Sequence, residues 1–132
     1  MSLSAETRNG VSGWPAILLR LEGAALLAAA SFAYSRLGGD WRWFAGLFFA
    51  PDLSFLAYLA GPRVGAVAYN SAHTTIVPLI VGALGVVLKE PFVTQIAAIH
   101  LAHIGFDRAL GYGLKYGTAF ADTHLGRIGR KA

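Results

Sequence analysis

Seven polar or ionisable side chains interrupt parts of the sequence that are otherwise almost free of charge. They are Glu22, Asp52, Asn70, His73, His100, His103 and Asp107. Such groups are costly inside a lipid bilayer, and they usually face the interior of a helix bundle, where they mark functional sites. Imidazole and carboxylate groups together bind zinc, iron and manganese. The same groups can transfer protons without a metal.

Two sets of these residues have the spacing that places side chains on one face of an α-helix. His100, His103 and Asp107 are separated by three and then by four residues, and neighbours at these separations lie along one helix face. Asn70 and His73 repeat the three-residue separation. Known carboxylate-bridged helix bundles use Glu-x-x-His pairs on two helices. This chain has His-x-x-His and Asn-x-x-His instead, so it does not match that metal-binding pattern.

The positions of these groups along their predicted helices indicate a common depth. At a rise of about 1.5 Å per residue, Glu22 and His73 lie about 12 and 14 Å from one membrane surface. Asp52, His100 and His103 lie about 12 to 18 Å from the opposite surface. Both estimates fall near the middle of a hydrocarbon core of about 30 Å. We therefore expect one polar layer to which all four predicted helices contribute.

This layer is the predicted site. Its expected metal ligands are His73, His100, His103, Asp52 and Glu22. Its expected catalytic groups, which act as acid, base or positioning residues, are Asp52, Asn70, His73, His100, His103 and Asp107. The alternative is a structural network, because membrane histidines also form hydrogen bonds between helices that contribute about 0.6 kcal/mol each. The sequence leaves the cofactor open, with a transition metal as the candidate.

The elements that must position this layer follow from the composition. Of the 132 residues, 55% are hydrophobic and 14% are charged, whereas soluble domains have about 25% charged residues. Four stretches are long and apolar enough to cross a bilayer, which takes about 20 residues. We predict an all-α fold, an integral membrane bundle of four sequentially antiparallel helices with short loops. The predicted helices span residues 14–37, 41–60, 64–88 and 92–114, between a flexible segment 1–13 and a basic cytoplasmic tail 115–132.

Turn and proline signals mark the predicted helix ends. Gly38-Gly39-Asp40 separates the first two helices, Gly61-Pro62 ends the second, and Lys89-Glu90-Pro91 precedes the fourth. Pro78 interrupts the third helix, because proline has no N–H to donate to the helical hydrogen-bond ladder. The chain has no cysteine, which excludes a disulfide scaffold and thiol chemistry.

The distribution of lysine and arginine predicts the orientation. Most of the 11 basic residues fall on the side that holds both termini and the second loop, so we expect a multi-pass protein of the cell membrane with both termini in the cytoplasm. The net charge of +4 does not indicate a nucleic-acid partner, because no aromatic residues interleave with the basic ones to stack on bases. The expected partners are membrane lipids, an apolar small-molecule substrate and a second copy in a homodimer.

Several motifs resemble a known family. They are Ala50-Pro51-Asp52-Leu53-Ser54, Ala60-Gly61-Pro62-Arg63-Val64-Gly65, Tyr69-Asn70 with His73-Thr74, Ala102-His103-Ile104-Gly105-Phe106-Asp107-Arg108, Gly111-Tyr112-Gly113-Leu114-Lys115-Tyr116, and Asp122-Thr123-His124-Leu125-Gly126. In these motifs the sequence beyond Pro15 resembles the small four-helix bacterial membrane proteins of domain-of-unknown-function family 4260. The resemblance implies a bacterial inner-membrane location and a four-helix fold, and it implies no activity. It leaves open whether Asp122 and His124 join the site.

The leading hypothesis for function is a membrane-embedded enzyme that acts on a lipid-like small molecule. Hydrolysis, oxidation and isomerisation all fit the polar layer, with or without a metal. The competing hypothesis is a protein that conducts protons or metal ions through the same layer, although four helices leave little room for a path and a gate. The third hypothesis is an accessory subunit of a larger membrane complex.

Overall fold

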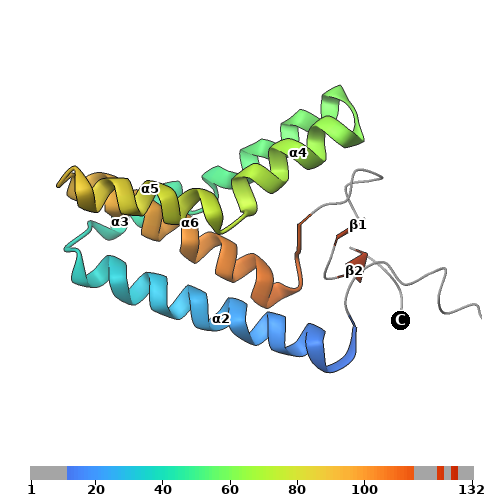
Figure 1. Cartoon of the computed structure of the whole chain (residues 1–132), viewed down its shortest axis with the longest axis horizontal. Helices are drawn as coiled ribbons and strands as arrows, with labels where there is room; N and C mark the ends of the chain where they lie inside the picture. The colour runs from blue at the N-terminus through green and yellow to red at the C-terminus, as the bar shows by residue number, and fades with distance from the viewer. Residues whose placement is uncertain (1–11, 115–121, 124–125, 128–132) are drawn as a thin grey trace, which may run out of the picture.

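The computed structural model describes residues 12–114, 122–123 and 126–127 (Figure 1). Its helices are α2 (Gly13–Arg36), α3 (Trp41–Leu47), the 3-10 helix η1 (Ala50–Ala60), α4 (Pro62–His73), α5 (Ile76–Val87) and α6 (Pro91–Leu110). Two short strands, β1 (Asp122–Thr123) and β2 (Gly126–Arg127), pair antiparallel. Apart from this strand pair, every described element is helical, which confirms the predicted all-α class.

Proline explains why the second and third predicted helices are each divided into two segments. α3 ends at Leu47, four residues before Pro51, which has no N–H to donate to the Leu47 carbonyl. Pro78 likewise has no N–H for the carbonyl of Thr74. α4 accordingly ends at His73, and the chain bends by 41° into α5. The interruption expected at Pro78 therefore lies about one helical turn before that residue.

A glycine ends α6 earlier than the sequence analysis expected. Gly111 has a φ of 91°, in the left-handed region that favours glycine. Its N–H donates to the carbonyl of Arg108 at 3.0 Å, and the N–H of Tyr112 donates to that of Asp107 at 2.8 Å. These bonds satisfy carbonyls that the helix itself leaves free, so α6 ends at Leu110 and not at residue 114.

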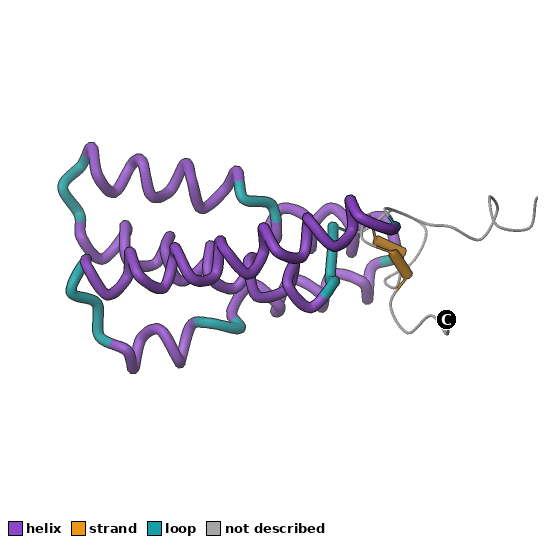
Figure 2. Tube along the Cα trace, turned by 90° about the horizontal axis from the view of Figure 1, so that it is seen from below, coloured by secondary structure: helices purple, strands orange, loops and turns teal. Residues whose placement is uncertain are grey.

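α6 lies at the centre of the arrangement. α2 and α5 pack along different sides of α6, and α3 contacts it more briefly (Figure 1). η1 and α4 instead pack chiefly against each other. Figure 2 shows the helices running side by side with short connections at their ends. In the described residues, the four predicted helices, of which the third was expected to be interrupted at Pro78, correspond to six helical segments, and the η1–α4 pair is set apart from the others.

Glycine lets α2 and α6 approach closely. A Cβ atom added to Gly105 would lie 2.5 Å from the backbone N of Leu27 and 2.6 Å from the carbonyl O of Gly23. A Cβ added to Gly23 would lie 2.8 Å from the carbonyl O of Gly105. The two helix backbones therefore touch at this crossing, as small residues permit in membrane proteins.

Large apolar side chains cover the outside of the molecule, among them Phe32, Leu59 and Val87. α2 and the segment Trp41–Ala60 are long and apolar enough to cross a membrane. The bent pair α4–α5 adds a third crossing if it counts as one span. These features indicate that the protein associates with a membrane.

Candidate metal centre

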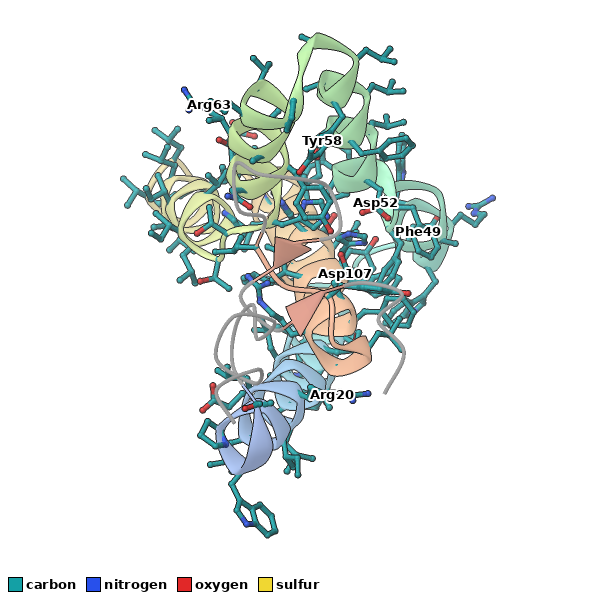
Figure 3. All side chains as sticks on the ribbon, turned by 90° about the vertical axis from the view of Figure 1, so that its right-hand side faces the viewer. Arg20, Phe49, Asp52, Tyr58, Arg63 and Asp107 are labelled. Atoms are coloured by element: carbon teal, nitrogen blue, oxygen red, sulfur yellow. The ribbon has the colours of Figure 1, made fainter. Side chains whose placement is uncertain are left out.

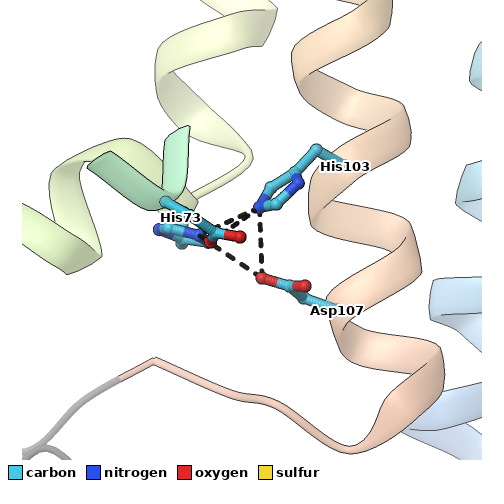
Figure 4. A group of neighbouring side chains, drawn as sticks. His73, His103 and Asp107 are labelled. Atoms are coloured by element: carbon cyan, nitrogen blue, oxygen red, sulfur yellow. Dashed lines mark hydrogen bonds and ion pairs between the residues drawn. The ribbon is translucent and has the colours of Figure 1, made fainter. Parts of the chain in front are cut away.

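Four side chains from three helices converge beside α6. They are Asp52 of η1, His73 of α4, and His103 and Asp107 of α6. One ligand atom of each lies within 4.8 Å of the ligand atoms of the others. We call these four residues the metal group. Figure 4 shows His73 reaching from α4 toward His103 and Asp107 on α6.

Local features of the chain place each member of the metal group. His73 is the last residue of α4, directly before the break that Pro78 causes. Asp52 lies in the first turn of η1 and follows Pro51. His103 and Asp107 are four residues apart on the uninterrupted α6, so their side chains lie on one face.

The ligand atoms are close enough to share one ion. His73 Nε2 lies 2.9 Å from Asp52 Oδ1 and 3.3 Å from Asp107 Oδ2. His103 Nε2 lies 3.1 Å from Asp52 Oδ1 and 3.2 Å from Asp107 Oδ2, and the two Nε2 atoms are 3.1 Å apart. Ligands bound at about 2.0–2.1 Å are separated by about 3.3 Å in a tetrahedron and about 2.9 Å at adjacent octahedral positions. These five separations lie within this range, and all four ligand atoms lie within 4.8 Å of one another, so the four residues are placed to bind one transition-metal ion.

A hydrogen bond at the second ring nitrogen of His73 determines what its Nε2 can do. His73 Nδ1 lies 2.8 Å from the carbonyl O of Tyr69, and a carbonyl only accepts, so Nδ1 carries a proton. In the neutral ring, Nε2 then presents a lone pair to the carboxylates of Asp52 and Asp107. Nε2 and the carboxylate oxygens are then all acceptors, so a positive charge must lie between them. Either a metal ion or protons can supply that charge. A backbone carbonyl that receives the other ring N–H is the usual companion of a metal-binding histidine.

His103 differs from His73 at its second ring nitrogen. His103 is fully buried, and its Nδ1 has no hydrogen-bond partner among the described residues. The polar contacts of this ring are therefore concentrated at Nε2, inside the metal group. Two ionised carboxylates, two neutral imidazoles and one divalent cation carry no net charge, and neutral sets are the least costly to bury.

Aromatic rings surround the two imidazoles. Tyr69 stacks on His73 with ring centroids 3.7 Å apart and an angle of 8° between the planes. Phe48 and Phe49 meet the His103 ring edge-on, with centroids at 5.4 and 5.9 Å. These rings exclude water from one side of the metal group, and electrostatic attraction strengthens when the surroundings are less polar.

The metal group is most accessible at Asp52. The side chain of Asp52 is 35% exposed, whereas those of His103 and Asp107 are 0% and 10% exposed. Figure 3 shows Asp52 beside Phe49 near the edge of the molecule, and Phe49 is itself exposed. An ion or a substrate would therefore approach past these two side chains.

The chain matches the family model described as a domain of unknown function (DUF4260) over residues 16–128. The chain belongs to the DUF4260 family. This match confirms the resemblance, and it includes all four residues of the metal group. No curated protein and no solved structure matches the chain.

The structure does not bring two of the expected ligands of this DUF4260 chain into the metal group. His100 lies one turn before His103, and its Nε2 instead hydrogen-bonds the carbonyl O of Ala72 on α4. Glu22 is exposed on α2. The neighbouring Gly23 contacts α6, whereas the side chain of Glu22 lies about 100° around the helix from that contact and is not part of the metal group.

Two further expectations remain predictions. Asn70 is half-buried on α4, one turn before His73, and its role as a positioning group is untested. The second concerns the tail motif, of which His124 and the side chain of Asp122 lie outside the described residues.

The sequence analysis missed two residues that support the DUF4260 metal group. Tyr69 both stacks on His73 and accepts its Nδ1–H. The four-residue separation of these two residues on one helix was a signal for that contact. Arg108 donates from Nη2 to the carbonyl O of His73 at 3.2 Å and so holds the end of α4. These residues are 35 positions apart, and sequence spacing carries no signal for that contact.

Proposed function

We propose that this DUF4260 protein is a membrane-embedded, metal-dependent enzyme that acts on an apolar, lipid-like small molecule. The observation that carries the proposal is the metal group, in which His73, His103, Asp52 and Asp107 direct their ligand atoms to one point. Buried ionisable groups in a chain with membrane-spanning helices usually serve a function, since their burial is costly.

The four ligands differ in what they would do during a reaction. His73, His103 and Asp107 are buried and would hold the ion in place. Asp52 is partly exposed, so it would be the ligand that moves aside or exchanges a proton with a substrate. A bound divalent ion would supply Lewis-acid polarisation of a substrate oxygen.

The surroundings of Asp52 support an apolar substrate. Phe49 is exposed beside Asp52, and Leu53 and Leu56 of η1 are exposed as well. Within a membrane these side chains face lipid, so a molecule dissolved in the bilayer reaches the metal group without crossing water. The proposal includes four membrane spans, in which α3–η1 and α4–α5 each form one span. It also places both termini in the cytoplasm.

Metal analysis of detergent-purified protein tests the proposal. We expect close to one zinc, iron or manganese ion per chain in the wild type and a large loss in His103→Gln. His100→Gln is the matched control, because it changes a histidine on the same helix that lies outside the metal group. Equal metal contents in all three proteins, or none after reloading with each ion, would refute a metal site.

A second experiment addresses the enzyme itself. Metal-loaded wild type and His103→Gln protein are incubated with a total membrane lipid extract, and lipid masses are compared over time. We expect a lipid species that the wild type consumes and the variant does not. Identical profiles for a variant that has lost its metal would refute the enzyme assignment while leaving the metal site intact.

One observation favours conduction of metal ions as a second candidate function. Asp52 and His73 both lie beside breaks in helical segments, and interrupted helices frame the ion sites of many transporters. Flux of zinc or protons into proteoliposomes separates this function from chemistry. Flux that Asp52→Asn abolishes would favour conduction, whereas metal binding without flux favours the enzyme.

A further inference from the structure

A second feature of the molecule lies on the α2 side of α6, away from the metal group. It is a groove of about 290 Å³ between α2 and the end of α6. Its lining residues are Ile17, Arg20, Leu21, Ala24 and Ala109. Figure 3 shows Arg20 beside α2, well separated from the labelled Asp52. We call this feature the α2 groove.

The guanidinium of Arg20 is held in one orientation at the α2 groove. Its Nε–H donates to the carbonyl O of Ala109 at 3.0 Å, and this carbonyl belongs to the last turn of α6, where helices leave acceptors free. The two terminal amino groups of the guanidinium form a planar fork that matches the oxygens of a phosphate. Holding Nε therefore presents this fork to a ligand without further ordering.

The charge of Arg20 lacks an acidic partner in the part of the chain that the structure describes. The ion pairs between described residues involve other groups. Glu22, which is close in sequence, lies about 200° around α2 from Arg20. An arginine charge on a lipid-facing helix is costly unless an anion compensates it.

The rest of the α2 groove is apolar. Ile17, Leu21 and Ala24 lie on the same face of α2 as Arg20 and are exposed, so in a membrane they contact acyl chains. A cation with an apolar surface along the same helix matches the two parts of a phospholipid, and basic pockets between membrane helices bind anionic lipid head groups.

We propose that the α2 groove binds an anionic phospholipid, with its phosphate on the fork of Arg20 and an acyl chain along Leu21 and Ala24. This site is independent of the metal group and of the enzyme assignment, since no residue is shared between them. The lipid would also link α2 to the end of α6, because the same guanidinium bonds Ala109.

Native mass spectrometry of detergent-purified protein titrated with phosphatidylglycerol or phosphatidylcholine tests the proposal. We expect the wild type to bind phosphatidylglycerol more tightly than phosphatidylcholine, and Arg20→Gln to weaken phosphatidylglycerol binding about tenfold, as for loss of charge-assisted hydrogen bonds. Arg36→Gln is the matched control, because it removes the same charge from the exposed end of the same helix. It should leave phosphatidylglycerol binding unchanged.

A groove-filling variant provides the second arm. Ala24→Phe retains Arg20 but places a ring where the acyl chain would lie, so it should also weaken phosphatidylglycerol binding. The proposal is overturned by equal effects of Arg20→Gln and Arg36→Gln, by equal binding of the two lipids to the wild type, or by full binding to Ala24→Phe. Metal content is measured in the same samples, and a metal-free protein that still prefers phosphatidylglycerol would support this site alone.

Discussion

The crossing of α2 and α6 at Gly105 makes a sharp prediction for Gly105→Ala. The new Cβ would lie 2.5 Å from the backbone N of Leu27 and 2.6 Å from the carbonyl O of Gly23, whereas ordinary contacts are 3.4–4 Å. Both obstructing atoms belong to the backbone of α2 and cannot rotate away. The helices must therefore separate locally by about 0.9 Å, the difference between 2.5 and 3.4 Å.

The expected cost follows from known overpacking effects. Extra atoms in a well-packed interior destabilise proteins by about 1–3 kcal/mol, and the rigid obstruction places Gly105→Ala near the upper end. Replacing a helical glycine by alanine returns up to about 1 kcal/mol. We expect a net loss of about 2 kcal/mol. Gly46→Ala is the control, because a Cβ at Gly46 in α3 meets nothing within 4 Å.

Unfolding by sodium dodecyl sulfate in mixed micelles, followed by circular dichroism, measures both variants. Gly105→Ala should unfold at a clearly lower detergent fraction than the wild type, and Gly46→Ala at the same or a higher one. If Gly105→Ala is as stable as Gly46→Ala, α2 and α6 do not meet backbone to backbone at this position, and the reasoning from close approach fails.

Three further predictions concern the site and its supports. Asp107→Asn should weaken zinc binding more than Asp52→Asn, as measured by competition with a chelator, because water can replace the exposed Asp52 ligand but has no access to the buried one. Pro78→Ala restores a backbone donor and should straighten the 41° bend between α4 and α5; zinc affinity should fall while helix content by circular dichroism stays the same or rises. Hydrogen bonds from the Arg42 side chain hold the pKa of Asp40 below its ordinary value. The cap that Asp40 forms on α3 therefore stabilises the fold fully above about pH 4 and loses that effect as the pH falls through the lowered pKa. In Arg42→Gln the Asp40 carboxyl should titrate at a higher pH by NMR.

The helical class of the fold was predictable because long apolar stretches of the sequence indicate membrane-spanning helices. The sequence did not predict the divided helices in detail. Proline rules locate a break about one turn before Pro51 and Pro78, and the structure has its breaks there. No pattern in the sequence predicts that residues 50–60 form a 3-10 helix, or that the η1–α4 pair packs chiefly on itself.

The candidate site shows where spacing and depth stop being informative. Both criteria place His100 and His103 on one face at nearly the same depth, yet only His103 lies at the level of Asp107 and His73. The estimated depth in the membrane was also the only reason to include Glu22 among the expected metal ligands. Which side of α2 meets α6 depends on the close approach at Gly23, and a glycine inside an apolar run carries no directional signal.

The contacts between α6 and the η1–α4 pair explain why this polar layer sits where it does. The helix pairs with the most extensive contacts are α2–α6, η1–α4 and α5–α6. The η1–α4 pair reaches α6 through three sets of polar contacts: the metal group, the bond from His100 to Ala72, and the bond from Arg108 to His73. Phe49, the residue before η1, adds an apolar contact with Phe106 of α6. Hydrophobic packing gives little preference between helix faces in lipid, whereas polar groups specify one partner.

An ion in the metal group would hold three helices together, and at 100 times its dissociation constant a bound ligand adds about 2.7 kcal/mol to stability. His100 and Arg108 would keep the pair positioned while Asp52, the exposed member of the group, exchanges with a ligand. The same arrangement therefore accounts for a firmly held centre and for one accessible edge.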